Sequence, residues 1–362
     1  MNISEENDIY SQIIRFFDPV GFQATPSGYQ FIFHQMFAPF KEIRQEFESR
    51  GFHIFLRKRG QEKFGILVRI PPQKPDSPRV PLILLVLTFI TTTWAGANYS
   101  YSLVRAGYIS SVWVGALSFS ISLLIILGGH ELGHKFTSLN HRVRASGPFF
   151  IPLPPFIFPL GTMGAIIKMK SPAPDRNAEI ALGANGPITG FLLSIPILIL
   201  GIKLSIPVDY STYISGKEVL IFGEPLIFQW LKHLILNLPP GKDIILHPLA
   251  FSGWVGLFVT ALNLIPLGQL DGGHVLMSII GEKRFRKLSF FIIGALFIAG
   301  LRYWEGWLFW AFIGIFFSFA GNPGPLNGLS KVGKREKIIA LVCALIFILS
   351  FMPVPVKYIA IP

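Results

Sequence analysis

The spacing of hydrophobic positions along the chain changes near residue 80. Before that point, apolar residues alternate with polar ones or recur with helical spacing. These patterns predict strands over 29–33, 52–57 and 64–70 and an amphipathic helix over 39–50. Residues 1–79 are therefore expected to form a small α+β domain, and no catalytic motif is found in it.

Beyond residue 80 the chain is a series of apolar stretches with few charges. A helix crosses a bilayer with about twenty residues, which makes seven of these stretches candidate spans. They lie at 82–98, 111–137, 178–202, 247–267, 288–303, 304–320 and 338–353. We expect a mainly α fold: a polytopic membrane helical bundle of about seven spans over residues 80–362, beside the N-terminal α+β domain.

Two further apolar segments lack the pattern of a span. Residues 147–167 contain five prolines, which forbid a regular spanning helix. We expect a re-entrant or interfacial loop there, with a hairpin-like path shielded by protein. Residues 226–238 are apolar on most faces but short, and this pattern favours a helix in the membrane interface.

Composition supports a membrane protein. Of the 362 residues, 51% are hydrophobic and only 14% are charged, whereas soluble domains carry about a quarter charged residues. Cys343 is the only cysteine, so a disulfide scaffold is excluded. The net charge of +12 raises the question of nucleic acid, but Lys and Arg lie in patches between apolar stretches. The expected partner is therefore the lipid bilayer and not nucleic acid.

The distribution of Lys and Arg also predicts an orientation. With seven spans and a cytosolic N-terminus, 25 of the 32 basic residues lie on the cytosolic side and 7 on the other. Because cytosolic loops carry the excess of basic residues, this division favours a cytosolic N-terminal domain and an external C-terminus. Residues 204–246 would then form an external loop.

Candidate chemistry lies in the second apolar stretch, where Glu131 stands between His130 and His134 in the sequence HELGH. Positions four apart share one face of a helix, so the two histidines can bind one metal ion. Glu131 lies beside that face and can accept a proton from a metal-bound water. Ionisable groups within a span are costly and seldom idle, which argues against a chance match. Zinc is the expected metal, because it prefers tetrahedral sites with imidazole and oxygen ligands.

A third protein ligand is expected, because catalytic zinc sites keep three protein ligands and one open position. Asp271 is the only acidic residue between Asp243 and Glu282. It follows the fourth apolar stretch and, by the predicted orientation, lies on the same side of the membrane as His130. Pro266 and the neighbouring glycines would let the chain bend toward the metal.

These motifs resemble the site-2 protease family of intramembrane zinc metalloproteases. HELGH is followed in a later span by the pattern N-x-x-P-x-x-x-x-D-G over residues 263–272. The resemblance extends over about residues 110–280, and the absence of an obvious PDZ insertion makes the chain similar to the archaeal and plant-plastid members. It implies that His130, His134 and Asp271 bind Zn2+ and that Glu131 is the catalytic base.

The resemblance also points to two residues near the substrate. Gly186 begins a G-x-x-x-G element of the third core span, and its small size would allow close approach to this site. Asn263 is a candidate for a polar contact to substrate, with helix packing as the alternative. His274, one turn after Asp271, is expected to support the site and not to bind the metal.

The predicted function is hydrolysis of peptide bonds in or near transmembrane segments of membrane proteins. A membrane metal transporter is an alternative, although a carrier would need metal-binding positions along a path and this chain has one compact set. A zinc-binding membrane protein without proteolytic activity is another, and the presence of Glu131 argues against it.

Overall fold

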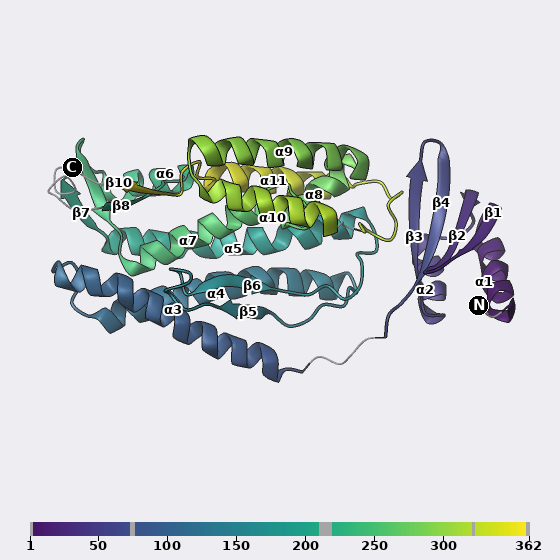
Figure 1. Ribbon diagram of the computed structural model, residues 1–362, viewed down its shortest axis with the longest axis horizontal. Helices are drawn as coiled ribbons and strands as arrows, with labels where there is room; N and C mark the ends of the chain where they lie inside the picture. The colour runs from purple at the N-terminus through teal and green to yellow at the C-terminus, as the bar shows by residue number, and fades with distance from the viewer. Residues whose placement is uncertain (1–2, 73–76, 210–218, 321–322, 360–362) are drawn as a thin grey trace. The chain divides into compact units, whose positions relative to one another are not determined.

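The computed structural model describes residues 3–72, 77–209, 219–320 and 323–359. It divides into two compact units (Figure 1). The N-terminal unit comprises Met1–Asp76, Pro172–Glu179 and Pro323–Gly333. The helical unit comprises Ser77–Ser171, Ile180–Asn322 and Lys334–Pro362.

The N-terminal unit contains a four-stranded antiparallel sheet. Its elements are α1 (Ile3–Phe16), β1 (Phe17–Thr25), β2 (Gly28–Met36), α2 (Phe40–Ser49), β3 (Phe52–Arg59) and β4 (Glu62–Arg69). The strand order is β1-β2-β4-β3. The predicted helix and three strands correspond to α2, β2, β3 and β4, whereas α1 and β1 are additional elements.

Alternation of side chains explains how this unit forms its core. Tyr29, Phe31 and Phe33 occupy every second position of β2 and are buried, as the period of a strand requires. Gly65 lies opposite Phe31 on β4, and a Cβ built there would come within 2.3 Å of the Phe31 ring. Phe47 of α2 is buried in the same cluster, so the helix covers this face of the sheet.

The helical unit is built from apolar helices. They are α3 (Arg79–Arg105), α4 (Val112–Asn140), α5 (Arg176–Leu204), α6 (Leu226–Leu236), α7 (Pro248–Leu264), α8 (Asp271–Ile280), α9 (Glu282–Arg302), α10 (Gly306–Ala320) and α11 (Lys334–Ser350). Each of the seven predicted apolar stretches coincides with a helix, with ends that differ by at most seven residues. The chain is thus mainly helical, and three helices, α3, α4 and α5, are long and apolar enough to cross a membrane. These helices support association with a membrane.

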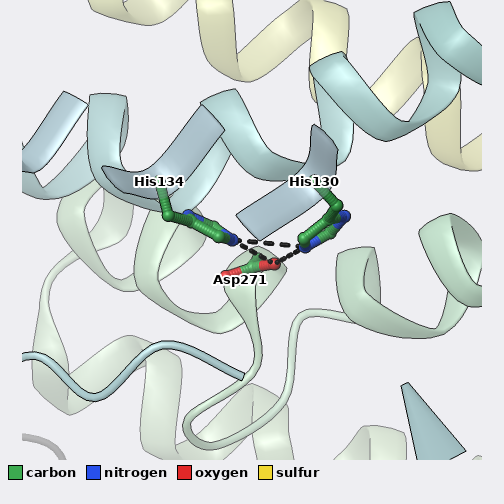
Figure 2. A group of neighbouring side chains, drawn as sticks. All are labelled: His130, His134 and Asp271. Atoms are coloured by element: carbon green, nitrogen blue, oxygen red, sulfur yellow. Dashed lines mark hydrogen bonds and ion pairs between the residues drawn. The ribbon is translucent and has the colours of Figure 1, made fainter. Parts of the chain in front are cut away.

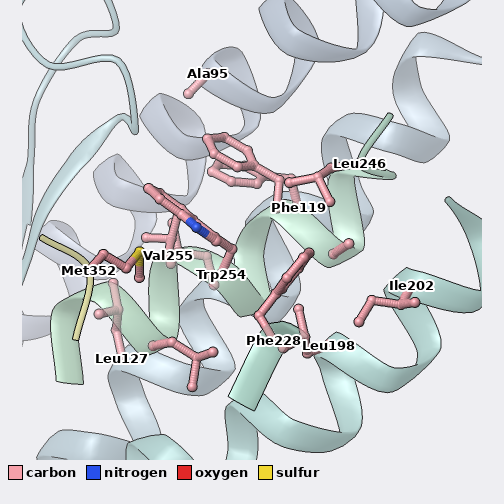
Figure 3. Packing of buried hydrophobic residues seen from close by; sticks show 14 of the residues in the cluster. Ala95, Phe119, Leu127, Leu198, Ile202, Phe228, Leu246, Trp254, Val255 and Met352 are labelled. Atoms are coloured by element: carbon pink, nitrogen blue, oxygen red, sulfur yellow. The ribbon is translucent and has the colours of Figure 1, made fainter. Parts of the chain in front are cut away.

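The core of the helical unit lies among α4, α5 and α7 (Figure 3). Phe119 of α4, Leu198 of α5 and Trp254 of α7 are almost fully buried in one cluster. Buried hydroxyls join neighbouring helices: Thr92 Oγ1 of α3 lies 2.6 Å from Ser120 Oγ of α4. Such pairs satisfy polar groups that would otherwise be unpaired in an apolar surrounding.

The proline-rich segment after α4 is a hairpin, as its sequence predicted. Strands β5 (Phe149–Pro152) and β6 (Thr162–Ile166) pair antiparallel. The hairpin packs on α3: Thr91 Oγ1 donates a hydrogen bond of 2.6 Å to the carbonyl of Gly161. Gly161 has a φ of +77° and sits against the α3 backbone, where a Cβ would come within 2.4 Å of an oxygen atom.

Short strand pairs lie elsewhere in the helical unit. They are β7 (Ile206–Asp209) with β9 (Lys242–Ile245), and β8 (Val219–Phe222) with β10 (Val356–Ile359). The predicted interfacial segment forms α6, in which Phe228 is buried while Trp230 and Leu234 are exposed. Such a helix, apolar on its exposed face, has the composition of an interfacial helix.

Candidate metal centre

His130 and His134 lie on one face of α4, as the helical repeat requires (Figure 2). Both side chains are buried, with 4% and 7% of their residue surfaces exposed. Their Nε2 atoms are 3.2 Å apart. The Nε2 atoms of the two imidazoles on α4 therefore converge in the buried interior of the helical unit.

Asp271 reaches the same place from the first residue of α8. Helix α7 ends at Leu264, because Pro266 lacks the amide hydrogen that would continue it. Gly268 turns the chain with a φ of +51°. Helix α8 then begins at Asp271, where a carboxylate is favoured by the helix dipole. The predicted bend thus exists and delivers the carboxylate to the histidines.

The three ligand atoms have the spacing of a tetrahedral zinc site. Asp271 Oδ2 lies 3.2 Å from His130 Nε2 and 3.3 Å from His134 Nε2. Bonds of about 2.0–2.1 Å around a tetrahedral zinc would separate its ligand atoms by roughly 3.3 Å. Among the described residues, this group of three could hold a metal ion, and His274 is not part of it. The donor set fits zinc.

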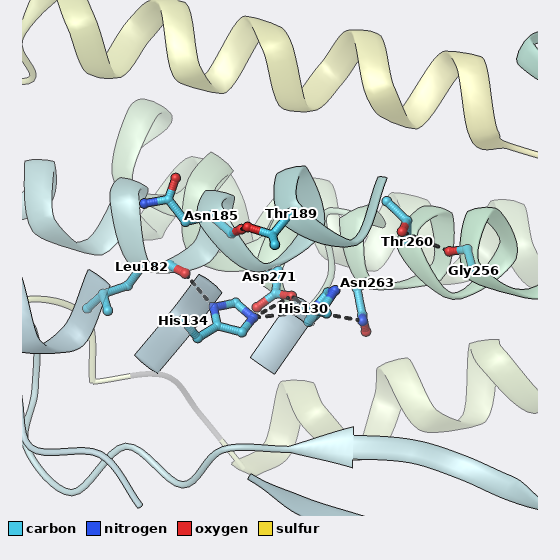
Figure 4. Close-up of polar contacts among 9 residues, drawn as sticks. All are labelled: His130, His134, Leu182, Asn185, Thr189, Gly256, Thr260, Asn263 and Asp271. Carbon is cyan, nitrogen blue, oxygen red and sulfur yellow. Dashed lines mark hydrogen bonds and ion pairs between the residues drawn. The ribbon is translucent and has the colours of Figure 1, made fainter. Parts of the chain in front are cut away.

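Helix α5 orients one of the histidines (Figure 4). The Nδ1–H of His134 donates a hydrogen bond of 2.7 Å to the carbonyl oxygen of Leu182. Because the proton is on Nδ1, the lone pair of Nε2 is free for a metal. Gly186, one turn further along α5, lies directly against the ring of His134. The sequence pattern predicted a role for Gly186, whereas a backbone carbonyl such as that of Leu182 leaves no signal in a sequence.

Glu131 is buried beside the histidines, with 5% of its surface exposed. Its carboxylate lies near the backbone amide of Ile167, the residue that follows β6, and interacts favourably with it. Sequence reasoning did not find this contact, which joins the hairpin to α4. The carboxylate is thus oriented by backbone from a separate element.

Asn263 lies at the end of α7, near the same centre. Its Nδ2 atom is 3.4 Å from His130 Nε2 (Figure 4). The side-chain amide is therefore next to the group of ligand atoms, at a place where it can contact a bound molecule.

Two imidazoles and a carboxylate thus meet between apolar helices, next to a buried glutamate. This is the donor set of a metal-dependent hydrolase within a helical membrane protein. The comparison with known families agrees with this class. The chain belongs to peptidase family M50, the site-2 protease family, whose model matches residues 118–301. The resemblance inferred from the sequence motifs is confirmed.

The chain is similar to plant proteins named as zinc metalloproteases. It is 29% identical to the "Probable zinc metalloprotease EGY1, chloroplastic" of Arabidopsis thaliana over 243 residues, which are 66% of this chain and 43% of that protein. It is 30% identical to the EGY1 protein of Oryza sativa subsp. japonica over 244 residues, 66% of this chain and 41% of that protein. The chain thus spans less than half the length of these relatives. No solved structure matches it.

Proposed function

We propose that this protein is an intramembrane zinc metalloendopeptidase, which hydrolyses peptide bonds in or near transmembrane segments of membrane proteins. The observation that carries the proposal is the convergence of His130, His134 and Asp271, with ligand atoms 3.2–3.3 Å apart, beside Glu131. Membership of peptidase family M50 and the names of the relatives support the same reaction.

In the proposed reaction, each residue of the site has a defined role. His130, His134 and Asp271 bind Zn2+, which when bound acidifies water and polarises a carbonyl group. Glu131 accepts a proton from the attacking water and returns it to the leaving amine. The Leu182 carbonyl keeps His134 in the tautomer that the metal needs, and Ile167 keeps the Glu131 carboxylate oriented.

The substrate would be held in extended form, because a helical segment hides its carbonyl groups in internal hydrogen bonds. The β5–β6 hairpin offers strand edges close to Glu131, where a substrate segment can add by main-chain hydrogen bonds. Asn263 would donate to the substrate backbone or to the oxyanion. Gly186 would leave room for this assembly by keeping α5 close to the histidine.

The membrane arrangement is part of the proposal. The seven apolar helices that match the predicted stretches would span the bilayer, with residues 1–79 and the metal centre on the cytosolic side and the C-terminus outside. The division of basic residues, 25 against 7, supports this orientation. The protease core would cover about residues 110–280, with residues 1–79 as a cytosolic cap domain.

The test is cleavage of transmembrane peptides by the purified protein in lipid nanodiscs. We expect cleavage that stops when a zinc chelator is added and returns when zinc is restored. Products should be identified by mass spectrometry, which places the cut within or near the apolar segment. Zinc uptake without any cleavage would instead favour a transporter or a non-proteolytic zinc protein.

A further inference from the structure

The β5–β6 hairpin continues beyond the ends of its two strands. Ala145 pairs with Met169 in an antiparallel bridge, several residues before β5 and after β6. Residues 144–152 and 162–170, here called the ribbon, therefore form one two-stranded structure. The ribbon lies beside α4 (Figure 1), and both belong to the helical unit.

One face of α4 contacts the ribbon. Gly128, Glu131 and Lys135 are three and four residues apart, so they lie on the same face of the helix. A Cβ at Gly128 would lie 3.5 Å from the ring of Phe150 in β5. Glu131 lies near the amide of Ile167, next to β6. The helix thus meets the ribbon along a stripe about 10 Å long.

Lys135 binds the first strand of the ribbon through its ammonium group. Nζ donates a hydrogen bond of 3.0 Å to the carbonyl of Ser146, and it also donates to the carbonyl of Ala145. The donor is charged, so each bond is stronger than a neutral hydrogen bond. The Lys135 side chain is half-buried, and the lower local dielectric strengthens these bonds further.

Ser146 joins the first strand of the ribbon to the second. Its amide donates to the carbonyl of Lys168 at 3.0 Å, and its Oγ accepts from the amide of Lys168 at 3.0 Å. Only 1% of Ser146 is exposed, so these bonds are shielded from water. Lys168 directly follows Ile167 in the chain. A continuous path of contacts therefore runs from Lys135 through the ribbon and returns to α4 at Glu131.

We propose that Lys135 is a positioning residue: by holding the ribbon on α4, it keeps the amide of Ile167 at the Glu131 carboxylate. The proposal rests on the proposed function for its effect on catalysis. A general base must face the group whose proton it accepts, and a small displacement costs much of the rate. The zinc ligands have other supports, such as the bond from His134 to the Leu182 carbonyl. Loss of the Lys135 contacts would therefore disturb the base and leave zinc bound.

The experiment uses the full chain in nanodiscs and the variant Lys135→Met, which keeps an unbranched side chain but has no donor. Lys203→Met is the matched control, because Lys203 is an exposed lysine near the end of α5. Ser146→Ala removes the hydroxyl that joins the two strands and serves if Lys135→Met fails to fold. Three quantities are measured: hydrogen exchange of residues 145–152 and 162–170, zinc affinity, and kcat for a transmembrane peptide.

With Lys135→Met we expect hydrogen exchange in the ribbon to rise roughly tenfold or more, because two charge-assisted hydrogen bonds are lost. The value of kcat should fall roughly tenfold, since the base is no longer held in place, while zinc affinity should match the wild type. Lys135→Arg should restore most of both losses, because a guanidinium group can donate to two carbonyls. Lys203→Met should match the wild type in all three quantities.

The double variant Lys135→Met/Ser146→Ala tests the path of contacts itself. If both residues act on Glu131 through the same path, the double variant should lower kcat about as much as the stronger single variant. Two residues that act independently would instead multiply their losses.

The proposal is overturned if Lys135→Met and Ser146→Ala both behave like Lys203→Met, or if hydrogen exchange rises while kcat stays unchanged. It is equally overturned if Lys135→Arg gives no rescue, or if the two losses in kcat multiply. A wild-type protein that cleaves no peptide would contradict the proposed function instead. Hydrogen exchange would still show in that case whether Lys135 holds the ribbon, because it requires no turnover.

Discussion

Gly186 lies directly against the imidazole of His134: a Cβ atom at this glycine would come within 2.1 Å of His134 Nε2. That nitrogen is one of the three proposed metal-binding atoms. The absence of a side chain at this position of α5 is therefore what allows α4 and α5 to approach while His134 keeps its orientation.

The substitution Gly186→Ala should weaken zinc binding. The added methyl group must displace the His134 ring, and disturbed support of a ligand usually costs roughly 10- to 100-fold in metal affinity. Zinc affinity is measured by competition with a chromophoric chelator. Gly294→Ala in α9 is the control, because a Cβ there meets no atom within 4 Å. Equal zinc affinity in the two variants would show that the glycine is not required.

The substitution Glu131→Gln should separate zinc binding from catalysis. The amide has the shape of the carboxylate but cannot accept the proton, so we expect full zinc content and a rate lowered by roughly 10² to 10⁴. Zinc is measured by elemental analysis and cleavage by mass spectrometry. Glu282→Gln, at an exposed residue, should leave both quantities unchanged. Undiminished cleavage by Glu131→Gln would exclude this residue as the base.

The stability of the N-terminal unit should depend on pH through Glu48. Burial raises the pKa of this carboxyl, but His53 at 3.5 Å and the Arg44 hydrogen bond at 2.7 Å outweigh it and hold the pKa below its ordinary value. Ionised Glu48 thus stabilises the fold above the ordinary glutamate pKa, and this contribution is lost as pH falls through the lowered pKa, below about pH 4.5.

The variant Glu48→Gln should therefore be less stable than the wild type at pH 7, by about 1 kcal/mol or less. The difference should shrink below about pH 4.5, as the wild-type carboxyl takes up its proton. Hydrogen exchange of β3 amides in the full chain, corrected for intrinsic rates, measures it. Glu62→Gln, at an exposed residue, serves as control. A difference that stays constant down to pH 3 would contradict the assignment.

Except for α8, the helices of the helical unit were predictable from the sequence, because each contains a long apolar stretch. The site was predictable for a related reason. The four-residue spacing of His130 and His134 is a local property of a helix, and Asp271 stands out as a lone acid in an apolar region. Pro266 marks the bend that brings it to the histidines.

Other elements left a weaker pattern. Strand β1 contains Pro19 and Gly21, and its register with β2 shifts at both, so alternation is lost. Helix α8 was not predicted, because Gly272 and Gly273 are poor helix formers. Both glycines pack against backbone: a Cβ atom would come within 2.1 Å of a backbone oxygen at Gly272 and within 2.6 Å of one at Gly273. The Leu182 carbonyl acts through a backbone group, which every residue carries, so only the three-dimensional structure reveals its role.

X-ray absorption at the zinc edge, on protein loaded with one equivalent of zinc, tests the central claim most directly. We predict two imidazole nitrogens and oxygen ligands at about 2.0–2.1 Å. Asp271→Ala should remove one oxygen ligand or replace it with water, and His130→Ala should remove one imidazole. A spectrum that is identical in the wild type and in both variants would mean that the zinc is bound elsewhere, and would contradict the account.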